Sequence, residues 1–340
     1  MSLETTPARR RNLGEMALQL RFTGVIAFLV VLGAVFSVLN GRFATGQNLT
    51  VIASNASILA IVAAAQALVL LTRNLDVSVG SIMGLTAYLS ADYAAHHPDI
   101  GAELVVIAIA VGALLGAING LIVAYAKVSP LIATLGTMSL YRGFTYIYAH
   151  GQEVTASRLP RWMLTAVDLR IGGVPMLILL CAAVVMVLAL FLRTQPLGRR
   201  IYAVGSNPLA SLFYGLQTER VTLFAYTIGG CLCGFAGLLY AARVGTVTVV
   251  LATGWELTSL AAAVLGGVSV AGGSGSVIGA ALGAVVLATI DNGLVLLGIP
   301  EFWRMFVQGV AIVLAVGVDV LIATRVRQAL KGQRFGGRLA

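Results

Sequence analysis

The chain has 340 residues, of which 59% are hydrophobic and only 10% are charged. A soluble domain is typically about 45–50% apolar and about 25% charged, so a soluble fold could not bury this much apolar surface. The composition therefore excludes an ordinary soluble enzyme or binding domain and favours an integral membrane protein.

Long apolar windows fill most of the chain. Because a hydrocarbon core about 30 Å thick needs roughly 20 apolar residues per helical crossing, the sequence predicts an all-α, polytopic transmembrane helical bundle with about ten membrane segments. A β-barrel is the weaker alternative, because the windows do not alternate in polarity. The predicted segments lie near residues 22–39, 50–71, 78–93, 103–125, 131–148, 174–192, 221–242, 257–270, 277–297 and 302–323.

Three of these windows are irregular. The third, fifth and eighth are short or interrupted by Gly and Ser. A re-entrant or irregular segment is therefore an open alternative to a full crossing at each of them.

Basic residues gather on one side of the predicted bundle. Cytoplasmic loops of membrane proteins carry an excess of Lys and Arg. With a cytoplasmic N-terminus and an even number of crossings, 15 of the 22 basic residues lie inside, whereas residues 92–103, which carry no Lys or Arg, lie outside. We therefore interpret the net charge of +9 as membrane topology and predict no nucleic-acid binding. The inner residues are Arg9, Arg10, Arg11, Arg21, Arg73, Lys127, Arg193, Arg199, Arg200, Arg220, Arg325, Arg327, Lys331, Arg334 and Arg338.

This orientation divides the chain into three parts. We expect a cytoplasmic N-terminal segment at 1–21, a transmembrane domain at 22–323 with a cytoplasmic loop near 193–220, and a cytoplasmic basic tail at 324–340. The apolar run from residue 22 is long and has no convincing cleavage site after it, so we interpret it as a retained signal anchor.

No motif of a catalytic or metal site is found. The sequence has no GxxxxGK[ST] phosphate loop, no HExxH helix and no CxxC pair. We predict no catalytic residue, no cofactor and no metal site. The three cysteines, Cys181, Cys231 and Cys233, lie inside predicted segments and are interpreted as packing residues.

Glycines recur every four residues in two windows, at Gly112, Gly116 and Gly120 and again at Gly275, Gly279 and Gly283. In lipid, small residues let helices approach closely. The pattern predicts close helix packing. Whether such helices also slide against one another is a question that these residues leave open.

Several polar residues lie at membrane depth, where an unpaired polar group is costly. Asn, Gln, Tyr and Asp side chains hydrogen-bond hydroxyl-rich solutes, but they also bond neighbouring helices. As a set they favour a path for a neutral polar solute. The candidates are Asn55, Gln66, Asn119, Tyr141, Asp291 and Asn292. Arg73 and Asp76, at an inner helix boundary, are expected to neutralise each other.

The loop at 193–220 contains a predicted short helix. Asn207 followed by Pro208 fits an N-cap with proline at the first helical position, and Gly215 fits a helix stop. The sequence therefore predicts a helix at 208–214 with Leu209, Leu212 and Phe213 along one apolar side. Such a helix fits either a partner's groove or the lipid headgroups.

Five stretches of the chain form a recognisable series. They are LTRNLDVSVGSIMGLTA (71–87), NGLIVAYAKVSPLIATLGTMSLYRG (119–143), GRRIYAVGSNPLASLFYG (198–215), ELTSLAAAVLGGVSVAGGSGSVIGAALGA (256–284) and NGLVLLGIPEFWRMFVQGV (292–310). Together they resemble the permease subunits of bacterial ATP-binding-cassette (ABC) importers of the ribose, xylose and arabinose class, which implies a location in the bacterial inner membrane. Within that class, TRNLDVSVGS and LVLLGIPEFW look closer to autoinducer-2 importer permeases than to ribose ones, and rhamnose permeases are similar as well. The sequence departs from the class at Thr258 and Ser259, where ELDAIAA is common.

The resemblance implies a transport subunit that does no bond chemistry of its own. It implies a dimer with a second permease copy or paralogue, a periplasmic solute-binding protein outside and a separate ATPase subunit inside. The ATPase would dock on the loop that contains Gly198, Arg199, Ala203, Gly205, Asn207, Pro208, Leu209 and Gly215. The alternative function is an ion- or proton-coupled secondary transporter of a small polar solute, for which Asp291 is the best candidate acid and Asp76 the next.

Overall fold

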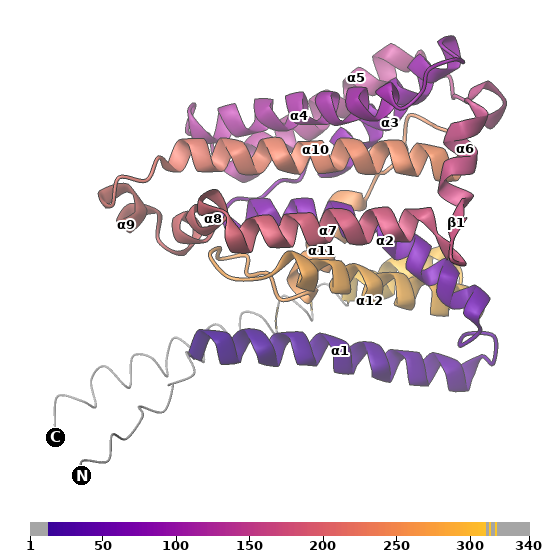
Figure 1. Ribbon diagram of the computed structural model, residues 1–340, viewed down its shortest axis with the longest axis horizontal. Coiled ribbons are helices and arrows are strands. Elements are labelled where there is room, and N and C mark those ends of the chain that lie inside the picture. Colours follow the sequence, from indigo (N-terminus) through magenta and orange to yellow (C-terminus); the bar gives the residue numbers. More distant parts are fainter. Residues whose placement is uncertain (1–12, 311–312, 314–316, 318–340) are drawn as a thin grey trace.

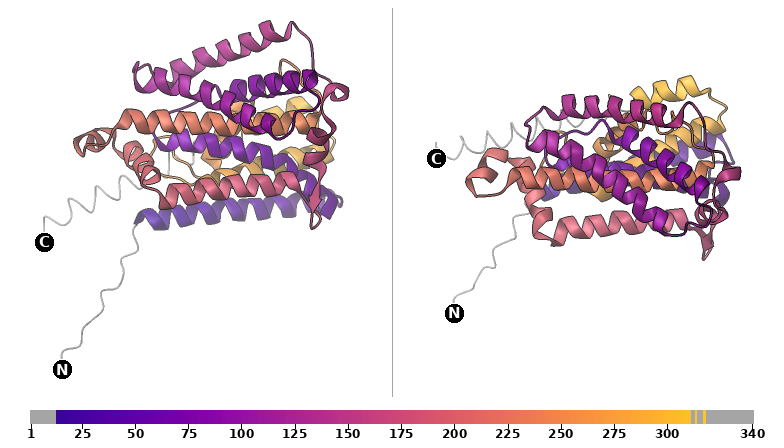
Figure 2. Two further views of the ribbon diagram at one scale, coloured as in Figure 1. Left: turned by 45° about the horizontal axis from the view of Figure 1, so that its top comes forward. Right: turned by 90° about the horizontal axis from the view of Figure 1, so that it is seen from above.

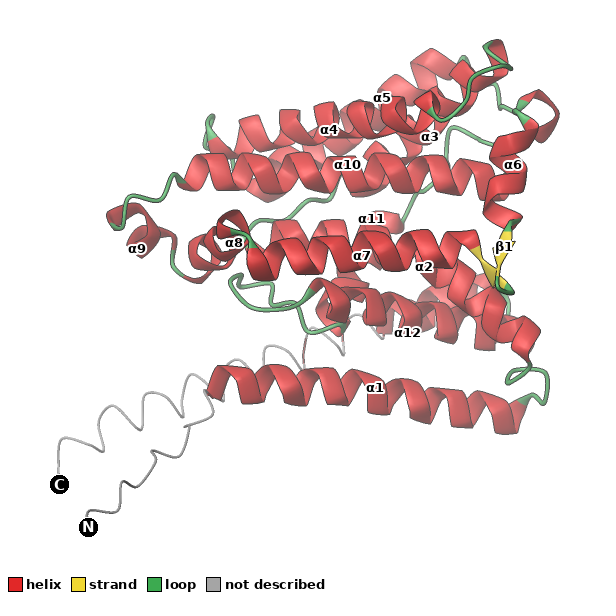
Figure 3. Cartoon of the chain, in the orientation of Figure 1, coloured by secondary structure: helices red, strands yellow, loops and turns green. Residues whose placement is uncertain are grey.

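The computed structural model describes residues 13–310 together with residues 313 and 317. Its long helices run side by side along one axis (Figure 1), and nearly all of the described chain is helical (Figure 3). The long helices are α1 (Leu13–Leu39), α2 (Gly46–Leu71), α3 (Val79–His96), α4 (Glu103–Ala124), α5 (Pro130–Ala149), α7 (Met176–Thr194), α10 (Thr218–Val244) and α12 (Val277–Leu296).

Shorter elements connect the long helices. A β-hairpin precedes α7, with Ile171 of β1 paired to Val174 of β2. The elements are the 3₁₀ turn η1 (Ala156–Arg158), α6 (Arg161–Asp168), β1 (Arg170–Ile171), β2 (Val174–Pro175), α8 (Pro196–Ser206), α9 (Pro208–Phe213) and α11 (Trp255–Leu265).

The predicted helical membrane fold is confirmed in its coarse form. Among the described residues, α2, α4, α7, α10 and α12 are long and apolar enough to cross a membrane. The eighth predicted window is only the 11-residue α11, whereas the fifth is the unbroken 20-residue α5. Of the tenth window, residues 302–310 are helical, and most of the remainder lies outside the described residues.

Helix α2 forms the centre of the bundle. In its most apolar stretch 89% of the residues are buried, compared with 33% in α4 and 28% in α7. A helix that is apolar on all sides is stable when neighbours surround it, and α2 packs against α7, α10, α11 and α12. The apolar faces that α4 and α7 leave exposed suit contact with lipid.

Glycines bring α4 and α10 into backbone contact, as the sequence predicted. Gly112 and Gly116 of α4 face Gly230 and Gly234 of α10. A Cβ atom built on Gly116 would lie 2.9 Å from the Cα of Gly230, so no side chain fits between the two helices. Dispersion contacts between closely approaching backbones hold helices together in lipid, where no hydrophobic force does so.

The second glycine series is divided between a helix and a loop. Gly279 and Gly283 lie on α12 and pack against Gly266 and Ala262. Gly275 lies before α12, at a φ of 137° that L side chains rarely adopt, and contacts Val268. The regular four-residue spacing of Gly275, Gly279 and Gly283 therefore does not place all three glycines on one helix face.

The two ends of the bundle differ. Helices α8 and α9 lie at one end, and α6 and the β-hairpin lie at the other (Figures 1 and 2). The ion pair between Lys127 and Glu219, with Nζ and Oε1 2.6 Å apart, joins the α4–α5 connection to the start of α10 at the α8–α9 end. Other basic residues at this end are Arg73, Arg193, Arg199, Arg200 and Arg220.

The α4–α10 contact gives a stability prediction. We expect Gly230→Ala to lower the free energy of unfolding by about 1–3 kcal/mol, because the new methyl group would collide with the Gly112 carbonyl oxygen. The adjacent Gly229→Ala is the matched control, since its nearest neighbour would be Val69 Cγ2 at an ordinary 3.4 Å. Thermal unfolding of the purified protein in detergent measures both; equal melting temperatures would contradict the packing account.

Candidate functional site

Helix α8 is packed into the end of the bundle through small residues. Gly198 rests on the backbone of Leu192 at the end of α7. A Cβ atom on Gly205 would collide with the carbonyl oxygen of Leu71 at the end of α2 and would lie 2.6 Å from the Gly273 nitrogen. Both glycines are buried, so they belong to internal packing rather than to an exposed docking surface.

Hydrogen bonds join α8 to the loop at residues 266–276, which precedes α12. The Tyr202 hydroxyl donates to the Gly275 carbonyl oxygen at 3.1 Å, and the Ser206 hydroxyl donates to that of Gly273 at 3.3 Å. The Gly273 N–H in turn donates to the Leu71 carbonyl oxygen at 3.1 Å. Burial raises the pKa of Tyr202, which therefore stays a neutral donor. Helix α8, the end of α2 and this loop form one connected unit.

Helix α9 matches the helix predicted from the sequence to within one residue. The Asn207 side chain accepts a hydrogen bond from the Ala210 N–H at 3.0 Å, as an N-cap does. Pro208 is the first helical residue, and Gly215 follows the helix at a φ of 76°. The helix stands at the far end of the molecule (Figure 1).

The apolar side of α9 is uncovered. Leu209, Leu212 and Phe213 are 70%, 55% and 88% exposed. We call these three residues the α9 foot. Of the other predicted loop residues, Arg199, Ala203, Asn207 and Gly215 are also exposed, and Pro208 is half-buried.

A second group of polar residues is buried where α3 begins. Asp76 Oδ1 accepts hydrogen bonds from the Ser78 N–H at 2.8 Å and the Ser78 hydroxyl at 2.6 Å. The Asn119 amide donates to the Ser78 hydroxyl at 2.6 Å, and the Tyr141 hydroxyl donates to Asn119 Oδ1 at 3.2 Å. Tyr226 completes the group by donating to the Leu75 carbonyl oxygen at 2.9 Å. These bonds hold the start of α3 to α4, α5 and α10.

Arg73 and Asp76 were expected to neutralise each other, but the structure gives them different neighbours. Asp76 is bonded by Ser78, whereas Arg73 has a φ of 64° and packs against Gly272 of the 266–276 loop. The tight turn after α2 directs the two side chains to different neighbours.

The six predicted solute-path residues lie in four separate places. Asn119 and Tyr141 are in the group around Asp76. Asn55 is exposed and accepts a hydrogen bond from Arg243 Nη2 at 2.5 Å. Asp291 pairs with Arg304 at 2.9 Å, while the neighbouring Asn292 exchanges hydrogen bonds with Asn48. Gln66 is separate from all of these.

Gln66 is the exception among the six in its bonding. Its side chain on α2 is fully buried, and neither the amide nitrogen nor the amide oxygen has a hydrogen-bond partner among the described residues. Buried polar groups are nearly always paired, and leaving one unpaired costs about 1–3 kcal/mol. Gln66 is therefore the one of the six whose side-chain hydrogen-bonding groups are all unused by the described residues.

Sequence reasoning missed a polar hollow at the end opposite α9. It has a volume of about 260 Å³ and is lined by residues that include Tyr88, Asp92 and Arg158. The Tyr148 hydroxyl donates to Asp92 Oδ2 at 2.9 Å, and the Tyr88 hydroxyl donates to the Gln152 carbonyl oxygen at 3.0 Å. Aromatic, carboxylate and guanidinium groups in one small hollow can contact a hydroxyl-rich molecule. The acids and tyrosines come from α3, from α5 and from the connection after α5. No single sequence motif therefore identifies the residues of this hollow.

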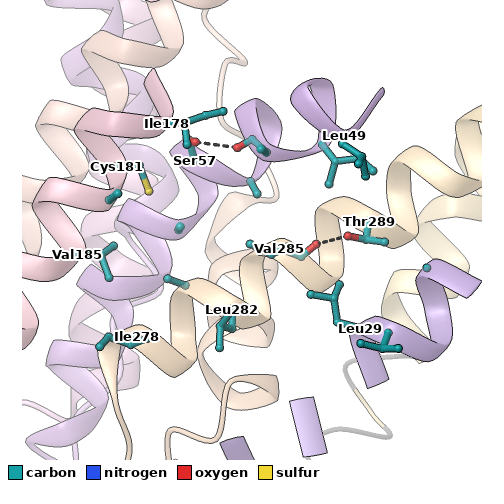
Figure 4. Close-up of a pocket in the computed structure, with 18 of the residues that line it drawn as sticks. Leu29, Leu49, Ser57, Ile178, Cys181, Val185, Ile278, Leu282, Val285 and Thr289 are labelled. Carbon is teal, nitrogen blue, oxygen red and sulfur yellow. Dashed lines mark hydrogen bonds between the residues drawn. The ribbon is translucent and has the colours of Figure 1, made fainter. Parts of the chain in front are cut away.

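A larger cavity is almost wholly apolar. It has a volume of about 610 Å³ and lies between α1, α2, α7 and α12 (Figure 4). Its two hydroxyl groups, on Ser57 and Thr289, both donate to carbonyl oxygens of their own helices at 2.7 Å. This lining offers nothing to a hydroxyl-rich solute.

Comparisons with known proteins agree on one family. Residues 48–316 match the family described as branched-chain amino acid transport system / permease component. The chain is 36% identical over 300 residues to the autoinducer 2 import system permease protein LsrC of Escherichia coli (strain K12 / DH10B), covering 87% of this chain and 86% of the relative. It is 37% identical over 301 residues to the ribose import permease protein RbsC of Escherichia coli (strain K12), covering 86% of this chain and 91% of the relative. No solved structure gives a significant match.

These matches confirm the resemblance that the five sequence stretches carry. They extend over nearly all of the described helices, including α8 and α9. The identities to the ribose and autoinducer-2 permeases are nearly equal, so they do not distinguish the two solutes. The chain therefore belongs to the branched-chain amino acid transport system permease family, as a multi-pass transport permease of the inner membrane.

Proposed function

We propose that this permease forms the pore of an ATP-binding-cassette importer for a sugar or a sugar-like solute, driven by a separate ATPase subunit. The observation that carries the proposal is the α9 foot, an apolar surface on a capped helix that stands clear of the bundle. The two relatives, named as import permeases for ribose and for autoinducer 2, support the solute class.

The charge at the two ends supports a topology with α8 and α9 in the cytoplasm. Arg193, Arg199, Arg200 and Arg220 lie at the same end of the bundle as the α9 foot, which is the pattern that the positive-inside rule describes for a cytoplasmic end. With about ten membrane segments, both termini of the chain then lie in the cytoplasm. The polar hollow around Asp92 lies at the periplasmic end, where a solute-binding protein would deliver its cargo. A second permease copy or paralogue would complete the pore.

The α9 foot is suited to a groove on the ATPase. A short amphipathic helix that presents apolar residues three and four positions apart is a common way to dock into a partner. Movement of α9 would pass to α8 and then, through Gly205 and Gly273, to the end of the central helix α2. The foot would thereby transmit the closing of the ATPase subunits to the pore.

Replacing a foot residue tests the docking. We expect Leu209→Asp to lower the amount of ATPase that copurifies with the permease by at least tenfold, because a buried charge at an apolar contact is strongly unfavourable. Its thermal unfolding should stay within about 0.5 kcal/mol of the wild type, since Leu209 is exposed. Gly205 is unsuitable for this test because it is internal.

Ile171→Asp is the matched control. Ile171 is a similarly exposed apolar residue, at 54%, in the hairpin at the opposite end of the bundle. Its replacement should leave ATPase copurification unchanged. Normal copurification with Leu209→Asp would exclude the α9 foot as the docking surface.

Gln66 is the predicted solute-path residue that we assign to solute contact. Its amide is unpaired among the described residues, whereas Asn119, Tyr141, Asp291 and Asn292 are each bonded to protein groups. An amide both donates and accepts hydrogen bonds, so it matches a sugar hydroxyl. Opening of the pore would let solute or water supply the missing partner.

This assignment predicts opposite effects on stability and on transport. Gln66→Leu should raise the free energy of unfolding by about 1–3 kcal/mol, because it removes a buried unpaired amide, and should slow solute uptake by the assembled importer. Asn119→Leu is the comparison, and it should lower stability because Ser78 and Tyr141 each lose one hydrogen bond. Thermal unfolding and uptake into membrane vesicles measure the two effects. Uptake at the wild-type rate with Gln66→Leu would refute the assignment.

Ion coupling is the competing function, and the bonding of the two candidate acids argues against it. An intramembrane acid that carries a coupling ion must be free to bind it. Asp291 is neutralised by Arg304, and Asp76 is bonded by Ser78. One oxygen of each carboxylate is therefore already engaged by a protein group.

A further inference from the structure

The apolar cavity between α1, α2, α7 and α12 has the form of a groove. Its walls are aliphatic side chains of α2, α7 and α12, and α1 forms one side (Figure 4). Helix α1 packs mainly on α12, and it is the outermost helix on its side of the bundle (Figure 1). The groove therefore lies where the protein meets the hydrocarbon of the membrane.

The lining excludes polar occupants. The Ser57 and Thr289 hydroxyl groups already donate hydrogen bonds to the carbonyl oxygens of Ala53 and Val285. The remaining lining is aliphatic or aromatic, apart from the Cys181 thiol, which is itself beside Ser57. A solute with hydroxyl groups would lose its hydration there and gain no hydrogen bond in return.

The length of the groove matches one leaflet of a bilayer. Ile278 and Thr289 of α12 both line it, and eleven residues of helix at about 1.5 Å per residue span about 16 Å. Half of a hydrocarbon core of about 30 Å is about 15 Å. A single acyl chain that enters from one membrane surface would therefore fill it.

An exposed arginine is next in sequence to one of the residues that line the groove. Phe43 and Leu49 both line the groove, and the exposed Arg42 is adjacent to Phe43 in the connection between α1 and α2. A guanidinium group is well suited to bind a phosphate. We propose that the groove is a binding site for one phospholipid, whose acyl chain lies between α1 and α7 and whose phosphate contacts Arg42.

A lipid bound at this site would help to hold α1 against the rest of the bundle. An acyl chain in the groove would add dispersion contacts between α1 and the rest of the bundle, where the surrounding lipid supplies no hydrophobic force. This inference requires only that the chain is embedded in a membrane. It stands or falls independently of the proposed docking of an ATPase on α9.

Photolabelling of the whole protein in nanodiscs tests the proposal. The probe is phosphatidylglycerol with a diazirine in the middle of one acyl chain, and the labelled residues are mapped by mass spectrometry. We expect labels to concentrate on the groove faces of α2, α7 and α12. An even distribution over the exposed apolar faces, including α5, would overturn the proposal.

Two adjacent alanines on α7 provide a matched pair. Ala182 lines the groove and Ala183 does not, although both are exposed. Ala182→Trp should reduce groove labelling at least fivefold by filling the space, whereas Ala183→Trp should leave it unchanged. Equal labelling in the two variants, or groove crosslinks to a second copy of the chain in place of lipid, would contradict the proposal.

Arg42→Gln tests the headgroup contact separately. The wild type should retain phosphatidylglycerol over phosphatidylcholine in competition, and this preference should fall at least threefold in the variant while acyl labelling persists. An unchanged preference would remove Arg42 from the site.

Discussion

Contact between the backbones of Gly205 and Leu71 is the constraint on which the working of this permease depends. It places α8 directly against the end of the central helix, with Gly273 bonded to the same Leu71 carbonyl oxygen. No side chain separates α8 from the core at this point. A displacement of α9 can therefore reach α2 without being absorbed by flexible side chains.

The same principle of close backbone contact builds the rest of the bundle. Gly112, Gly116, Gly230 and Gly234 hold α4 against α10, and Gly266 and Gly279 hold α11 against α12. Hydrogen bonds around Asp76 then anchor the start of α3. Helices that lack a hydrophobic force between them need such directional and short-range contacts. Uncovered apolar faces remain at the membrane and at α9, where partners or lipid can bind.

Local features of this structure could be predicted from the sequence, and long-range ones could not. The cap at Asn207, Pro208 at the first helical position and the stop at Gly215 act within one helical turn, so α9 was predictable to within one residue. Helix α8 was missed as a helix because its packing depends on Leu192, Leu71 and Gly273, which the loop sequence does not reveal. The partners of Asn292 and Asp291 are likewise distant in the chain or set by the fold. Periodicity identifies the helices but not which polar groups they bring together.

The most direct test of the account is the number of solute molecules imported per ATP hydrolysed by the assembled importer, compared between the wild type and Gly205→Ala. The added methyl group would force α8 away from the Leu71 carbonyl oxygen while leaving the α9 foot exposed. We expect that the ATPase still binds and hydrolyses ATP but that import per ATP falls severalfold. An unchanged ratio would show that the power stroke does not pass through this contact.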